Sequence, residues 1–388
     1  MATREAVHLS LIAHSDLGGS GDGMQIMRNG DALYVGHLGN FGVATSILDV
    51  SDVSAPRLVR QLAAPPGTHC HKVQVADGLL LVNEEQYKGG DPFTAGMVVY
   101  DVSDPFEPNR IGHFDSGGLG VHRIVYRGGR YAYVSAIPEG FDSRIWVIVD
   151  LADPEHPVEA GRWWYPGQWR GGGEKPSWPE GKKFAAHHAL LDGEVAYLGC
   201  CDANLVVLDV ADPAAPKLLS ELRWSPGGFT HTCMPLPGRG LVVTTDEAVK
   251  DRCAEEEKLV HVVDVADVHD PKLLSVCPPP DRSHCERGLR FGPHNLHENY
   301  DGSYRSETLV FVTYFNAGLR VYGIADATRP REIAYWEPEP PPGQEAPQSN
   351  DLFVDDEMNI FVSDRFTGGL YVLAPDEALS QAMTDARL

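Results

Sequence analysis

The chain has 388 residues and a formal net charge of −23, from 32 Lys and Arg against 55 Asp and Glu. This charge argues against nucleic acid and anionic membranes as partners, because the protein would repel their phosphates. An apolar share of 43% excludes wholesale disorder. The sequence has no apolar run of about 18 residues that would predict a membrane span. Its first residues lack the apolar stretch of a signal peptide, so we expect a cytoplasmic protein.

Cysteine and histidine usage give two further expectations. The seven cysteines are odd in number and contain no Cys-x-x-Cys pair. In a chain without a secretory signal, they predict reduced thiols rather than a disulfide framework or a zinc knuckle. The 16 histidines are about 4% of the chain, roughly twice a common share. Histidine is therefore the residue type to follow when looking for a site.

A short motif recurs along the chain about every 50 residues. Each copy is a β-branched or aliphatic run that ends in Asp-x-Ser/Ala-Asp, a sequence typical of a turn in which the Asp side chain binds nearby backbone. The copies lie at residues 47–52, 99–105, 149–154, 208–213, 263–267 and 322–326. In the sixth copy a glycine replaces the first aspartate. Repetition at this period predicts a modular, all-β architecture.

A predicted hairpin precedes the motif in most periods, at residues 73–82, 124–134, 189–198 and 234–243. Each period then holds four strands and almost no helix, which is the pattern of a propeller blade. We count seven blades, with the first around residues 24–35 and the last at 351–362 and 369–373. The last blade lacks an outer strand, and we expect residues 6–12 to close it and remove the free edge. Residues 1–388 thus predict one seven-bladed β-propeller domain, with 375–388 as a short helical tail.

The repeated Val-x-Asp-Val-x-Asp-Pro sequence resembles the LVIVD-repeat β-propeller proteins over roughly residues 30–340. The resemblance implies the fold and, by itself, no activity. A more distant similarity is to the selenium-binding protein and methanethiol oxidase family. Its members carry Asp-x-Ser-Asp-Pro-x-x-Pro turns and a histidine-lined, metal-binding propeller. No residue role is carried over from that family.

Histidines recur where the first strand of a blade begins, in five consecutive blades. First strands start near the axis on one face of a propeller, so these side chains are expected to converge. We predict that they bind one transition-metal ion, with iron as the first choice and copper, manganese or zinc as alternatives. The predicted ligands are His71, His122, His188, His231 and His294. Only one of His187 and His188 can face the axis, and His188 is chosen because it directly precedes an apolar run. The alternatives are an imidazole-lined channel without metal and a structural role inherited with the repeat.

Polar residues at the ends of second strands and on long loops map to the same face. The predicted catalytic residues are Glu85, Glu247 and Arg123. Long segments at 164–186, 277–293 and 337–349, with insertions at 86–95 and 247–258, are expected to form a lid over a small-molecule substrate. The predicted substrate-binding residues are His69, Trp169, Trp178, His284, Arg287, Tyr314 and Arg365, and Arg290 is a further cation facing an anionic or carbonyl group.

These features support a cytoplasmic metalloenzyme with oxidoreductase or oxygenase chemistry on a small organic molecule. An open coordination position on the metal would activate O₂ or polarise a substrate oxygen. The first alternative is a metal-assisted lyase or hydrolase, which would need Glu85 or Glu247 as acid or base. The second is a non-catalytic propeller that binds protein partners.

Overall fold

The computed structural model describes residues 2–86 and 93–388, so residues 87–92 of the expected 86–95 insertion lie outside the described part. Its strands pair antiparallel, and the first sheet in chain order is the simplest. That sheet has the order β3-β4-β5-β6 and contains β3 (Gly23–Asn29), β4 (Ala32–His37), β5 (Val43–Asp49) and β6 (Arg57–Ala63).

Two larger sheets follow, and each joins two repeats of the chain. The first contains β7 (Thr68–His69), β8 (Val73–Ala76), β9 (Leu79–Gln86), β10 (Gly96–Asp101), β11 (Asn109–Asp115), β12 (Gly118–Val125), β13 (Tyr131–Pro138), β14 (Ile145–Asp150) and β15 (Val158–Trp163). The second contains β16 (Phe184–Asp192), β17 (Val195–Cys201), β18 (Leu205–Asp209), β19 (Lys217–Leu222), β20 (Thr230–Leu236), β21 (Leu241–Asp246), β22 (Val260–Asp264) and β23 (Lys272–Val276). A single residue pair links the two halves of each sheet, Glu85 with Gly120 and Cys201 with Thr230.

The last two sheets take their outermost strands from the N-terminus. One contains β24 (Leu309–Thr313), β25 (Leu319–Gly323), β26 (Arg331–Pro338) and β1 (Thr3–Val7). The other contains β27 (Ser349–Val354), β28 (Ile360–Asp364), β29 (Leu370–Pro375) and β2 (Leu9–Ser15). The expected pairing of the N-terminus with the last sheet is present, but the single strand expected at 6–12 is wrong. His8 has a φ of 61°, which breaks the chain into two strands that serve neighbouring sheets.

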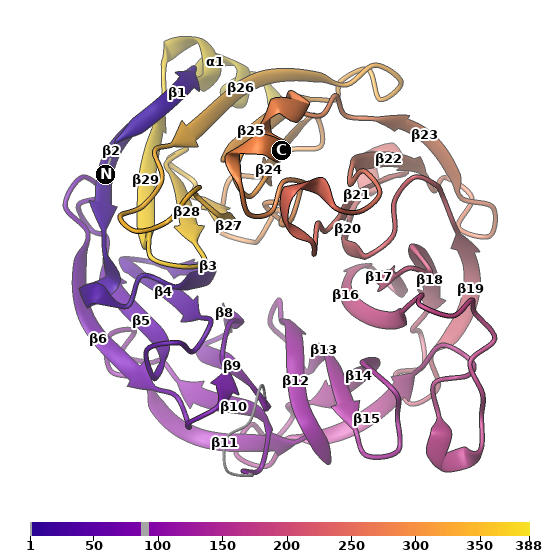
Figure 1. The fold of residues 1–388 in the computed structure, drawn as a ribbon. Coiled ribbons are helices and arrows are strands. Elements are labelled where there is room, and N and C mark those ends of the chain that lie inside the picture. The colour runs from indigo at the N-terminus through magenta and orange to yellow at the C-terminus, as the bar shows by residue number, and fades with distance from the viewer. Residues whose placement is uncertain (1, 87–92) are drawn as a thin grey trace.

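The sheets stand around a central axis like the blades of a propeller (Figure 1). Strands β3, β8, β12, β16, β20, β24 and β27 lie nearest the centre, and β6, β11, β19 and β23 run along the outside. The core lies between the faces of neighbouring sheets. One apolar cluster, for example, joins Ile47 of β5, Val73 of β8 and Phe361 of β28. The inner strands therefore meet at the axis with their starts on one face.

The turns predicted after each motif form as expected. In each of them an aspartate carboxylate accepts a hydrogen bond from the backbone N–H two residues further on. The pairs are Asp49–Ser51, Asp101–Ser103, Asp150–Ala152, Asp209–Ala211, Asp264–Ala266 and Asp326–Thr328. These turns fix where each third strand ends and the outer strand begins.

Helical segments are short and lie outside the sheets. They are η1 (Leu17–Gly19), η2 (Arg170–Gly172), η3 (Pro237–Arg239), η4 (Asp251–Cys253), η5 (Arg282–Arg287) and α1 (Glu377–Ala386). The expected helical tail is α1, which buries Leu379 and Met383 against the last sheets. Within the described residues, no helix is long and apolar enough to cross a membrane.

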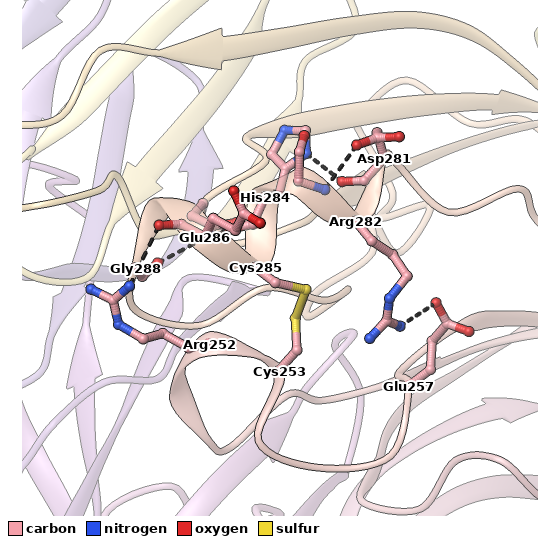
Figure 2. Close-up of a disulfide and its surroundings, with 11 residues drawn as sticks. Arg252, Cys253, Glu257, Asp281, Arg282, His284, Cys285, Glu286 and Gly288 are labelled. Carbon is pink, nitrogen blue, oxygen red and sulfur yellow. Dashed lines mark hydrogen bonds and ion pairs between the residues drawn. A yellow bond between two sulfur atoms is a disulfide. The ribbon is translucent and has the colours of Figure 1, made fainter.

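One disulfide joins two loops above the ring, which corrects the expectation that all cysteines are reduced. Cys253 at the end of η4 bonds Cys285 in η5 (Figure 2). The other five cysteines are buried and free. The two bonded residues are 32 positions apart and meet only through the fold, so their spacing gave no signal.

Removing this disulfide is expected to destabilise the protein. Closing a loop of 32 residues lowers the entropy of the unfolded chain by an amount worth about 4 kcal/mol. The double variant Cys253→Ser and Cys285→Ser should therefore unfold at a lower urea concentration than the parent. Reduction of the parent should reproduce the shift and leave the double variant unchanged. Equal unfolding midpoints for parent and variant would contradict the prediction.

Candidate metal centre

A cavity of about 220 Å³ opens where the inner strands begin. It draws side chains from successive sheets around the axis, which places it at one end of the central channel. Its lining is Met24, His69, His71, Lys72, Glu85, His122, Arg144, His187, Phe229, His231, Glu247, Val249, Arg290, His294 and Arg365. Imidazole is the most frequent group in this lining.

Five of these imidazoles form a continuous arc around the cavity. The ring centroids of His71 and His122 are 4.7 Å apart, and those of His122 and His187 are 5.0 Å apart. The arc continues from His187 to His231 at 4.0 Å and from His231 to His294 at 4.3 Å. Each histidine comes from a different inner strand or from the segment that leads into one, so the repeat brings them together around the axis.

His187, and not His188, belongs to this arc, which corrects the chosen register. His188 is buried below the cavity, where its Nδ1 lies 3.3 Å from Thr232 Oγ1 and 3.5 Å from Glu298 Oε1. The pairing of β16 with β17 shifts between Phe184 and His188, so the strand reaches the axis one residue earlier than expected.

The sequence did contain a signal for the observed register. At all five positions the histidine of the arc is followed by a polar residue and only then by an apolar residue. The triplets are His71-Lys72-Val73, His122-Arg123-Ile124, His187-His188-Ala189, His231-Thr232-Cys233 and His294-Asn295-Leu296. Alignment on this triplet, rather than on the residue next to the apolar run, selects His187.

The closest approach in the arc joins Nε2 of His122 to Nε2 of His187, at 3.2 Å. His122 Nδ1 donates to the carboxylate of Glu85 at 2.7 Å, and His187 Nδ1 donates to the backbone carbonyl of His231 at 3.2 Å. Both partners are acceptors, so the proton of each neutral ring is on Nδ1. The two Nε2 atoms therefore direct lone pairs toward the same point.

Burial keeps both rings neutral. Desolvation lowers the pKa of His122 to about 3 and the pKa of His187 well below its usual range. Burial opposes ionisation of Glu85, but its interactions with His122 and His69 outweigh that effect and lower its pKa. Two facing lone pairs repel each other unless a cation lies between them. Ligands about 2.1 Å from one ion are about 3.0–3.4 Å apart, and the observed separation falls in this range.

Further donors surround this pair in two groups. In each group the candidate ligand atoms lie within 4.8 Å of one another. The groups are His69, His71, Glu85 and His122 on one side and His187, His231 and Glu247 on the other. Among the described residues, Nε2 of His71 is buried and has no hydrogen-bond partner. His294 donates from Nδ1 to the carbonyl of Asn350 at 2.6 Å, which leaves its Nε2 as an acceptor near Glu247. Such a donor set suits iron, copper, zinc or manganese.

The remaining predicted residues that line the cavity are Glu85, His69, Glu247, Arg290 and Arg365. Glu85 orients His122 and also lies 3.3 Å from His69 Nδ1, and His69 stacks on His71. Glu247 accepts from Arg290 at 2.9 Å. Arg365 lines the cavity as well. Glu85 therefore has the geometry of a carboxylate that orients a metal ligand.

Besides His188, six predicted site residues lie outside the cavity. Arg123 is buried beneath it, where it donates to Glu298 at 2.7 Å, because it occupies the polar position of its triplet. Trp169 is 42% exposed on its loop and packs on Phe141. The remaining four are held elsewhere: Trp178 stacks on Phe184, His284 and Arg287 bind Glu337, and Tyr314 packs in the apolar core. The loops that carry these residues fold outward or against the sheets and contribute none of them to the cavity lining.

Six residues of the lining were not predicted as site residues: Met24, Lys72, Arg144, His187, Phe229 and Val249. Lys72 follows His71 in its triplet, so the repeat could have indicated it. Arg144 and Phe229 lie in loops without a recurring pattern, and only the folded chain brings them to the axis.

The fold is shared with solved structures of low sequence identity. A protein from Lactobacillus plantarum matches with a TM-score of 0.62 and 13% identity, over 92% of this chain and 92% of that one. The periplasmic gluconolactonase of Pseudomonas aeruginosa matches at 0.59 and 13%, over 87% and 93%. A β-propeller domain from Myceliophteria thermophila matches at 0.58 and 12%, over 91% and 97%. At these identities the likeness concerns the fold alone, which is that of a β-propeller.

The family model of the LVIVD repeat matches residues 186–222, which span β16 to β19. This stretch therefore matches an LVIVD repeat, and the fold around it is that of a β-propeller. No curated protein matches the sequence. The more distant resemblance to selenium-binding proteins is not shown by these comparisons.

Proposed function

We propose that this protein is a metalloenzyme that holds one transition-metal ion at the mouth of its channel. The observation that carries the proposal is the pair of Nε2 atoms of His122 and His187, 3.2 Å apart, each with its proton fixed on Nδ1. His71 and His231 extend the donor set on the two sides. The proposal also includes seven blades, and five of these blades contribute an imidazole to the arc.

Oxidoreductase chemistry on a small organic molecule is the reaction class that this donor set supports best. A ring of neutral imidazoles suits a redox metal, and iron is our first choice. Metal-assisted hydrolysis or elimination would require a carboxylate that is free to move a proton. Glu85 is engaged by His122 and Glu247 by Arg290, so neither carboxylate is free for that role. When bound, the ion would supply an open coordination position for O₂ or for a substrate oxygen.

The test is elemental analysis of protein purified without added metal, followed by a probe of the open position. We expect about one iron, copper, manganese or zinc ion per chain. The ferrous-loaded protein should bind nitric oxide under anaerobic conditions and show the half-integer-spin EPR signal of a mononuclear iron nitrosyl. Absence of metal, together with no uptake of any of these ions by the apoprotein, would contradict the proposal.

A further inference from the structure

The cavity lining is positively charged, although the protein is strongly acidic. Among the described lining residues, three arginines stand against two carboxylates: Arg144, Arg290 and Arg365 against Glu85 and Glu247. Lys72 is not counted, because it is buried and desolvation lowers its pKa well below the usual range. The chain as a whole has a net charge of −23. A concave site whose charge opposes that of the surrounding protein concentrates ligands of the opposite charge. This distribution favours an anionic ligand.

Arg144 is the cation whose surroundings point most directly to such a ligand. It is only 7% exposed, yet none of the described residues forms an ion pair with it. Its Nε donates to the carbonyl of Ala186 at 3.2 Å, and its Nη2 lies 3.6 Å from the thiol of Cys201. Its Nη1 has no hydrogen-bond partner in the described part of the chain. Arg290, by contrast, is paired with Glu247. A buried cation without a counter-charge is costly, and a bound anion would offset that cost.

The position of Arg144 links the anion site to the metal centre. Ala186, which accepts from Arg144, immediately precedes His187 in β16. The guanidinium and the imidazole therefore share one edge of the cavity. A planar guanidinium binds a carboxylate through two parallel hydrogen bonds, which fixes the orientation of the ligand as well as its position.

A second cleft continues the cavity on this side and supplies another cation and an apolar wall. The cleft has a volume of about 440 Å³ and shares Phe229 and Val249 with the cavity. Lys183 lines it, with Nζ 5.9 Å from the centroid of the Phe229 ring. The positive charge of Arg144 and the burial of Lys183 both lower the pKa of this lysine. Phe229 thus lines the cavity together with Arg144 and lies beside Lys183 in the adjoining cleft.

We propose that the cavity binds a small organic carboxylate, with its carboxylate group on Arg144 and Lys183 and its apolar part against Phe229. The proposal rests on the proposed metalloenzyme, because it names the substrate class of the same site. The contacts that it assigns belong to the protein alone, so binding can be measured with and without metal.

The experiment is calorimetric titration of the purified protein with benzoate, an aromatic carboxylate, in the metal-free and the Co²⁺-loaded states. Benzamide serves as the uncharged ligand of the same shape, and inorganic phosphate as an anion without an apolar part. The variants are Arg144→Gln, Arg144→Lys and Lys183→Gln. Arg130→Gln is the matched control, because Arg130 is an exposed arginine paired with Asp150 outside the cavity.

Benzoate should bind more tightly than benzamide and phosphate in both states. Arg144→Gln should weaken benzoate binding at least about tenfold, the usual scale for a charged hydrogen-bonding partner. Arg144→Lys should recover part of the lost benzoate affinity. Lys183→Gln should weaken benzoate binding about threefold, because it removes a partly exposed charge. Arg130→Gln should leave benzoate binding unchanged.

Equal binding of benzoate and benzamide, or unchanged benzoate binding by folded Arg144→Gln, would overturn the proposal. So would binding of phosphate in place of benzoate. If Arg144→Gln does not fold, Lys183→Gln serves as the test. An unchanged benzoate affinity in Lys183→Gln would also overturn the proposal. Failure of the proposed metal centre alone would give a different result: the parent protein would take up no metal and would still bind benzoate.

Discussion

Replacement of His187 by alanine is expected to abolish high-affinity metal binding, whereas replacement of His188 by alanine leaves it intact. Loss of a group that merely orients a ligand usually costs 10- to 100-fold in affinity, so loss of a ligand should cost at least about 100-fold. His187 provides one of the two converging Nε2 atoms, and His188 lies below the cavity beside Glu298. Metal retained per chain after dialysis against a weak chelator measures the effect.

The two variants also differ in their expected effect on stability. His188 is buried, and its removal leaves a cavity that costs about 2–4 kcal/mol. His187 is buried too, but it borders the cavity, so its removal breaks fewer packing contacts and should cost less. The pair therefore separates metal binding from folding, because the more damaging substitution is the one expected to keep the metal. If His188→Ala lost the metal and His187→Ala retained it, the metal ligand would be His188, as chosen from the sequence.

Deletion of residues 1–16 is expected to lower the free energy of unfolding by several kcal/mol. The deletion removes β1 and β2 and uncovers the edges of β26 and β29. It also removes Leu9, which is 5% exposed and packs in the core of the last two sheets. Loss of a paired strand belongs to the rare class of changes with large effects. Urea unfolding of parent and truncated protein measures the difference.

A shorter truncation provides the control for this deletion. Removal of residues 1–8 takes away only β1, whose side chains are mostly exposed and whose loss leaves β2 in place. Its effect should be smaller than that of the longer deletion. Identical unfolding curves for the parent and the protein lacking residues 1–16 would show that the N-terminal strands do not close the ring.

The repeat predicted the parts of the fold that depend on local sequence. The turns after each motif form because aspartate binds its own backbone, and this needs no information from elsewhere in the chain. The arc of histidines was predicted for the same reason, since each sits at an equivalent place in its repeat. The register of one of them was missed because His187 and His188 are adjacent, and choosing between them requires comparison of whole triplets.

Features that join distant segments could not be predicted in this way. Cys253 and Cys285 meet because two loops cross above the ring, and no spacing in the sequence encodes that crossing. Arg144 reaches the cavity from the loop between β13 and β14, whose sequence does not recur in the other repeats. Trp169 and Trp178 were expected over the cavity on the basis of loop length alone. Their indole rings pack against aromatic neighbours of their own region instead.

The most direct test of the account is anomalous X-ray diffraction from crystals of the metal-loaded protein, measured at the absorption edge of the bound metal. The account predicts one anomalous peak between His122 and His187, about 2.0–2.3 Å from both Nε2 atoms. A peak elsewhere in the molecule, or no peak in crystals soaked with iron, copper, manganese and zinc in turn, would contradict it.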